Sequence, residues 1–140
     1  MAADGTPLRN RPTSDEATLH GQPTVLIVED ELFPRIDLSD ALREAGFRVL
    51  EAVSGDEAER ILQTHEDIDL VLTDVQMPGS LDGIALARRV IEQRPTTKVI
   101  VMSGQRRALA ETPHVFAALD KPFHPAAAIA QIRRALGEHH

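Results

Sequence analysis

Residues 24–31 read TVLIVEDE, an uninterrupted apolar run that ends in three carboxylates. The pattern returns at 70–74, where LVLT precedes Asp74, and in two later apolar runs that lead into Ser103 and Lys121. Continuous apolar runs of this kind are typical of parallel strands that helices cover on both faces. The pattern therefore predicts an open α/β sheet, in which working side chains gather beyond the carboxyl ends of the strands.

Strand and helix patterns alternate through the rest of the chain. We expect strands at 24–28, 47–52, 68–73, 98–102 and 115–119. Helices are expected at 32–45, 82–93, 105–111 and from about 125 to 136. A further helix is expected to begin at the capping box of residues 54–57. Five such strand–helix units predict one doubly wound domain with a five-stranded parallel sheet.

Local signals predict where some side chains lie. Gly46 stands where a helix C-terminal cap belongs, and Phe116 is expected to be an ordinary core residue. His65 is expected at a helix end rather than in a metal site, because no second histidine stands at metal-ligand spacing. The helix at 32–45 is expected to bury one broad face, made of Leu32, Ile36, Leu38, Leu42 and Ala45.

Composition excludes several classes of protein. The formal net charge of −7 and the lack of a Lys/Arg-rich run argue against nucleic-acid binding, and the absence of cysteine excludes disulfides and thiolate metal sites. Residues 1–22 lack the apolar core of a signal peptide, and no stretch approaches transmembrane length. We expect a cytoplasmic protein without a membrane partner, with a flexible extension or docking segment at 1–22 and one domain at 23–140.

The side chains at the predicted strand ends suit phosphoryl transfer. The Asp74 carboxylate can act as a nucleophile toward phosphorus. Glu29 and Asp30 beside it would raise one another's pKa unless a cation such as Mg²⁺, which takes oxygen ligands, removed the repulsion. Lys121 and the Ser103 hydroxyl would neutralise phosphoryl oxygens.

Each of these residues also has a structural explanation. Asp74 also suits a helix N-cap or a turn, and the pair Glu29 and Asp30 suits charges that cap the first helix. Ser103 before a glycine suits a turn, and Lys121 suits a solvated surface. Because each residue stands at the end of a different predicted strand, a shared site explains the set better than these separate roles do.

Four motifs in order resemble the receiver domain of two-component response regulators. The resemblance covers residues 24 to about 137 and implies a CheY-like, flavodoxin-like (βα)5 fold. The motifs are VLIVEDE at 25–31, LVLTDVQMPG at 70–79, VIVMSG at 99–104 and LDKPF at 119–123.

The resemblance implies a metal site and a phosphoacceptor. Asp74 corresponds to the phosphoacceptor, whose carboxylate also binds the metal. Asp30 corresponds to a direct Mg²⁺ ligand and Glu29 to a ligand acting through water, and the backbone carbonyl of Gln76 would be a third protein ligand. Mn²⁺ is the implied alternative ion.

It also implies a signalling role. Ser103 matches the hydroxyl that moves toward the phosphoryl group, and Lys121 matches a lysine that a cis peptide joins to Pro122. The expected donor is a histidine kinase or phosphotransfer protein, and the expected output is contact with a protein target, without an output domain. Turnover of external substrates is not expected, since an aspartate-nucleophile phosphatase needs a second acid where Gln76 stands. A docking module that works without phosphorylation stays open as the alternative.

Three departures from the family pattern stand out. The loop at 77–83 looks one residue longer than usual, and the segment 103–121 looks shorter, which predicts a stunted fourth helix. Ala118 occupies the position of a switch aromatic, with Phe116 two residues earlier. These departures affect the output surface and the coupling to it rather than the chemistry at Asp74.

Overall fold

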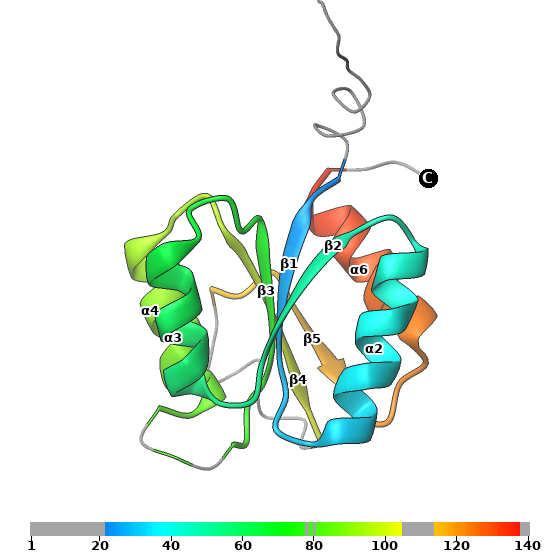
Figure 1. Ribbon diagram of the computed structural model, residues 1–140, viewed down its shortest axis with the longest axis horizontal. Coiled ribbons are helices and arrows are strands. Elements are labelled where there is room, and N and C mark those ends of the chain that lie inside the picture. The colour runs from blue at the N-terminus through cyan, green and yellow to red at the C-terminus, as the bar shows by residue number, and fades with distance from the viewer. Residues whose placement is uncertain (1–21, 78, 80, 105–113, 138–140) are drawn as a thin grey trace, which may run out of the picture.

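Five parallel strands form one sheet in the computed structural model, which describes residues 22–77, 79, 81–104 and 114–137 (Figure 1). The sheet has the order β2-β1-β3-β4-β5, which confirms the predicted doubly wound, flavodoxin-like fold. The strands are β1 (Thr24–Val28), β2 (Arg48–Ala52), β3 (Leu70–Asp74), β4 (Lys98–Ser103) and β5 (Ala117–Asp120).

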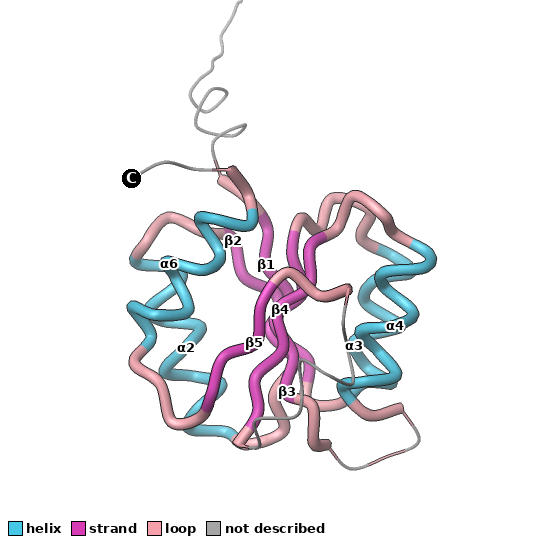
Figure 2. The backbone as a smooth tube through the Cα atoms, turned by 180° about the vertical axis from the view of Figure 1, so that it is seen from behind, coloured by secondary structure: helices cyan, strands magenta, loops and turns pink. Residues whose placement is uncertain are grey.

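Helices cover both faces of this sheet. Seen from either side, α2 and α6 lie against one face and α3 and α4 against the other (Figures 1 and 2). Along β1, Val25 and Ile27 join the core under α2 and α6, while Leu26 and Val28 join the core under α3 and α4. Successive side chains of a strand point to opposite faces of the sheet. A strand that helices cover on both faces therefore needs an unbroken apolar run. The described helices are α2 (Leu32–Glu44), α3 (Gly55–Thr64), α4 (Gly83–Gln93) and α6 (Pro125–Ala135).

The predicted signals at helix ends match the structure. Gly46 follows α2 with φ of +100°, a conformation that favours glycine, and the N–H of Phe47 donates to the carbonyl of Leu42 to close the turn. At the start of α3 the Ser54 hydroxyl accepts a hydrogen bond from the N–H of Glu57. His65 is the C-terminal residue capping α3, as expected.

The predicted buried face of α2 is wrong in part. Leu38 and Leu42 are buried, whereas Leu32 is 51% exposed and Ile36 is 39% exposed. A helix turns by about 100° per residue, so Ile36 lies about 160° around the helix from Leu38 and cannot share its face. The first turn of α2 therefore presents apolar side chains to solvent beside the carboxyl ends of the strands.

Strand limits and one core assignment also differ from prediction. β3 begins and ends later than expected, so that Asp74 is its last residue rather than the residue after it. Phe116 is 39% exposed rather than buried. It precedes the edge strand β5, and its ring centroid lies 5.8 Å from the guanidinium carbon of Arg134. The expected helix at 105–111 and residues 1–21 of the expected extension lie outside the described residues.

Candidate functional site

The ends of β1 and β3 meet near the middle of the sheet. These two strands pair in parallel, with Val28 opposite Thr73, so Glu29 follows β1 beside Asp74 at the end of β3. The chain leaves β1 toward β2 on one side, and β3 lies on the other. This is the switch point at which open α/β sheets place their ligands.

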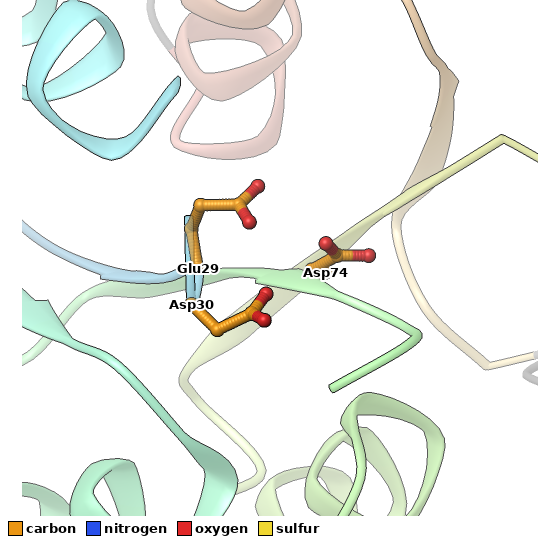
Figure 3. A group of neighbouring side chains, drawn as sticks. All are labelled: Glu29, Asp30 and Asp74. Atoms are coloured by element: carbon orange, nitrogen blue, oxygen red, sulfur yellow. The ribbon is translucent and has the colours of Figure 1, made fainter. Parts of the chain in front are cut away.

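Three carboxylates converge at this point. Glu29, Asp30 and Asp74, here called the acidic pocket, each offer an oxygen within 4.8 Å of the others. Figure 3 shows the three carboxylate groups projecting to the same side of the strand ends. Glu29 is 1% exposed and Asp74 is 7% exposed, whereas Asp30 is exposed, so the pocket opens to solvent beside Asp30.

Lys121 joins the two buried carboxylates. Its Nζ atom donates to Oε1 of Glu29 at 3.0 Å and to Oδ2 of Asp74 at 2.8 Å. The backbone N–H of Lys121 donates to the carbonyl of Ser103 at 2.7 Å, which ties the end of β5 to the end of β4. The peptide bond from Lys121 to Pro122 is cis, as the resemblance implied.

Backbone N–H groups satisfy the other carboxylate oxygens. The N–H of Gln76 donates to Oδ1 of Asp74 at 3.2 Å, and that of Glu31 donates to Oε2 of Glu29 at 3.1 Å. Each buried carboxylate is thus held by the ammonium on one oxygen and by the backbone on the other, which fixes its orientation.

The roles of helix cap and solvated surface charge do not account for Glu29, Asp74 and Lys121. The N-cap of α4 is Asp82 rather than Asp74, and the N-cap of α2 is Glu31, without a side-chain cap. The Lys121 side chain is 28% exposed and doubly paired, so it is not a solvated surface charge. The structure thus brings Glu29, Asp74 and Lys121 into one hydrogen-bonded group.

Burial and charge shift two pKa values in the pocket. Burial raises the pKa of Glu29 above its ordinary value, although its hydrogen bond with Lys121 opposes this. Burial alone would lower the pKa of Lys121, but the hydrogen bonds and charges of Asp74 and Glu29 outweigh it and raise that pKa. Lys121 therefore stays protonated, and the pocket still lacks positive charge for its carboxylates.

This imbalance fits a divalent cation with oxygen ligands. Three carboxylates share one ammonium, and burial without enough counter-charge is what raises the pKa of Glu29. A hard cation such as Mg²⁺ takes carboxylate oxygens and keeps several waters, which suits a pocket that is open on the side of the exposed Asp30. The side chains present therefore fit the ion that the sequence predicts.

The remaining predicted residues lie at the same edge. Ser103 is buried as the last residue of β4, next to β3 in the sheet. Gln76 is exposed in the loop after β3, and the predicted role of its carbonyl as a ligand stays a prediction. Ala118 is half-buried against the core under α3 and α4.

Two residues of this site were not predicted from the sequence. Arg35 donates to the backbone carbonyl of Glu29 at 3.1 Å. Gly83 packs so closely on the backbone of Asp74 that a Cβ atom there would overlap the Asp74 carbonyl oxygen. An arginine in the first turn of a helix carries no sequence signal for such a role, while the Asp-Gly pair at 82–83 signalled only a helix start.

A family model gives the first comparison with known proteins. The model described as "Response regulator receiver domain" matches residues 25–133.

Among the described residues, no helix combines the length and hydropathy needed to cross a membrane.

Individual relatives agree with this match. The chain is 39% identical over 103 residues to the transcriptional regulatory protein PdtaR of Mycobacterium tuberculosis, covering 71% of this chain and about half (49%) of that protein's length. It is 36% identical over 104 residues to the response regulator receiver protein CpdR of Brucella abortus, covering 71% of this chain and 85% of CpdR. A solved response regulator receiver protein from Sinorhizobium medicae superposes with a TM-score of 0.77 and 29% identity, over 83% of this chain and 95% of that one.

Proposed function

The chain belongs to the response regulator receiver family of two-component signalling, and we propose that it accepts a phosphoryl group on Asp74 from a histidine kinase or histidine phosphotransfer protein. The observation that carries the proposal is Lys121, which holds Asp74 and Glu29 together through bonds of 2.8 and 3.0 Å. We propose residues 23–140 as the receiver unit, with 1–22 preceding it, and the cytoplasm as its compartment, because phosphohistidine donors are made from ATP.

Asp74 is the proposed nucleophile of a single displacement at phosphorus. One Asp74 carboxylate oxygen forms a bond to phosphorus while the bond from phosphorus to the histidine nitrogen breaks, and the imidazole leaves. Lys121 and the N–H of Gln76 already donate to this carboxylate, so both stand within reach of a phosphoryl group attached to it. The Ser103 hydroxyl is the proposed third donor. The chain thus catalyses only its own phosphorylation and the hydrolysis that follows.

The acidic pocket is the proposed site of Mg²⁺, with Mn²⁺ as a substitute. Asp30 and Asp74 would hold the ion directly, Glu29 through water, and Gln76 through its carbonyl. The bound ion would neutralise charge on the phosphoryl oxygens. Without it, three carboxylates face one lysine, which disfavours the approach of an anionic donor.

The surface around the pocket supports a protein as the donor. A groove of about 380 Å³ runs from Glu29 and Lys121 to Phe33 and Phe123. Phe33 is 75% exposed, next to the exposed Leu32 in the first turn of α2. An exposed apolar group of this kind at the rim of a reactive site suits contact with another protein. We propose that phosphorylation then changes the affinity for a second protein, through the added charge and acceptor oxygens.

The direct test is intact-protein mass spectrometry after incubation with acetyl phosphate. We expect one added phosphate when Mg²⁺ is present and none when a chelator removes it. If Mg²⁺ binds and no phosphate is added, transfer from purified phosphorylated histidine kinases is the deciding assay. Failure of both would leave a docking module that works without phosphorylation and would overturn the proposal.

Mg²⁺ is also expected to stabilise the unphosphorylated protein. The ion relieves repulsion that exists only where folding has brought the carboxylates together, so it binds the folded state and shifts the unfolding equilibrium. At a concentration about 100 times its Kd it would add about 2.7 kcal/mol to the free energy of unfolding. Thermal unfolding followed by far-UV circular dichroism checks this, with Asp30→Asn as the variant whose response should shrink. A melting temperature that ignores millimolar Mg²⁺ would contradict it.

A further inference from the structure

Arg35 connects the acidic pocket to the edge strand β2, which lies beside β1. In the first turns of α2, its Nη1 donates to the backbone carbonyl of Glu29 at 3.1 Å, and its Nε donates to Oε1 of Glu51 on β2 at 3.1 Å. The Arg35 side chain is 13% exposed. A planar guanidinium that is held at two points has little freedom to move, so its contact with Glu29 is fixed in direction.

This contact fixes the peptide unit that leads into Asp30. The N–H of Glu29 donates to the carbonyl of Ala52 at 3.0 Å, and the carbonyl of Glu29 accepts from Arg35. That carbonyl belongs to the peptide that joins Glu29 to Asp30. Its direction therefore sets the backbone from which the exposed Asp30 side chain reaches the other two carboxylates.

We propose that Arg35 is a positioning residue for the cation site: it holds the Glu29–Asp30 peptide so that the Asp30 carboxylate meets those of Glu29 and Asp74. The inference rests on the proposed function, because it concerns the ion which that function uses. In this role Arg35 acts through the backbone carbonyl of Glu29 and is not itself a ligand of the ion. Residues of this kind around metal sites change metal affinity about 10- to 100-fold when they are replaced.

Two possible roles of Arg35, as a repelling charge and as a positioning residue, predict opposite changes in Mg²⁺ affinity when it is replaced. A guanidinium bonded to the backbone of the pocket repels a cation there, so its removal should tighten Mg²⁺ binding if only charge counts. If Arg35 positions Asp30, the same removal should weaken Mg²⁺ binding because the carboxylates no longer converge. The direction of the change therefore separates the two explanations.

Arg43 is the matched control for this comparison. It lies later on α2 and pairs with the other oxygen of the same glutamate, Oε2 of Glu51, at 3.2 Å. Its side chain is 48% exposed, and it also donates to the carbonyl of Val49 rather than to the pocket backbone. Arg43→Gln thus removes the same charge and one contact with the same glutamate, without touching Glu29.

The experiment is calorimetric titration of the full chain with MgCl₂, comparing Arg35→Gln and Arg43→Gln with wild type. We expect Mg²⁺ affinity to fall about tenfold in Arg35→Gln and to change less than twofold in Arg43→Gln. Circular dichroism without Mg²⁺ shows that the proteins compared are folded. An Arg35→Gln affinity equal to or tighter than wild type would overturn the inference, as would an equal loss in Arg43→Gln.

A second variant covers the case in which Arg35→Gln does not fold. Arg35→Lys keeps the charge, but its single ammonium cannot hold both the Glu29 carbonyl and the Glu51 carboxylate in the same geometry. We expect its Mg²⁺ affinity to fall several-fold, and an affinity equal to wild type would overturn the inference. Absence of Mg²⁺ binding in wild type would instead count against the proposed function, so the two failures are distinct.

Discussion

Asp74→Asn is expected to abolish phosphorylation by acetyl phosphate and by any histidine donor, while the protein stays folded. An amide nitrogen and oxygen keep the shape of the carboxylate but remove the charge that makes it a nucleophile. The amide oxygen can still accept from Lys121 or from the N–H of Gln76, which are the two donors seen in the structure. Mass spectrometry with Mg²⁺ should show a phosphate on wild type and none on the variant.

The fold should not suffer from this change. It removes one of three clustered carboxylates, so it lowers repulsion when no ion is bound, and Lys121 keeps its bond with Glu29. The melting temperature without Mg²⁺ should therefore equal or exceed that of wild type.

Asp120→Asn is the control for the phosphorylation result. Asp120 ends strand β5, which β4 separates from β3 in the sheet, and it is exposed, outside the acidic pocket. The Asp120→Asn variant should take up one phosphate, as wild type does. Retained labelling of Asp74→Asn would remove Asp74 from its proposed role, and loss of labelling in Asp120→Asn would show that the assay responds to any nearby charge.

The sheet and the meeting of these residues could be predicted from the sequence because both follow from strand ends. A parallel strand that is covered on both faces has no place for a charge along its middle, so the first carboxylate after β1 or at the end of β3 marks the edge of the sheet. Parallel strands bring all such edges to one side. Glu29 and Lys121 are 92 residues apart in sequence, yet both follow strands of the same sheet.

Contacts made away from strand ends were not predictable in this way. The bond from Arg35 to a backbone carbonyl depends on the angle at which α2 leaves the sheet, and a carbonyl leaves no mark in the sequence. Which residues of α2 are buried was not predictable for a related reason. Its apolar residues surround much of the helix, and only the packing against β1, β2 and α6 decides which are buried. Leu32 and Ile36 stay at the surface.

Contacts between backbone atoms join the loop after Asp74 to the start of α4. The N–H of Gly83, the first residue of α4, donates to the carbonyl of Val75 at 3.2 Å. The Asp74 carbonyl accepts from the Thr73 hydroxyl at 2.9 Å and faces the Cα of Gly83 directly. The position of α4 and the position of Asp74 are therefore coupled through a glycine that has no room for a side chain.

Gly83→Ala is accordingly expected to destabilise the protein by about 3 kcal/mol and to lower its melting temperature by about 10 °C. An added Cβ would overlap the carbonyl oxygen of Asp74 and lie 2.6 Å from the Cα of Val75, and backbone atoms cannot turn aside as a side chain can. Thermal unfolding by circular dichroism measures the loss. The helix propensity of alanine would by itself favour the variant by about 1 kcal/mol, so a destabilisation can come only from the overlap.

Gly104→Ala supplies the matched control, because Gly104 follows β4 at the same edge of the sheet and a Cβ there meets no atom of the described residues within 4 Å. That variant should stay within about 0.5 kcal/mol of wild type. The folded fraction of Gly83→Ala should also take up phosphate more slowly, since the overlap lies against the backbone of Asp74 and its relief disturbs that backbone. If Gly83→Ala were as stable and as readily phosphorylated as Gly104→Ala, the inferred effect of the close packing of α4 on β3 would be wrong.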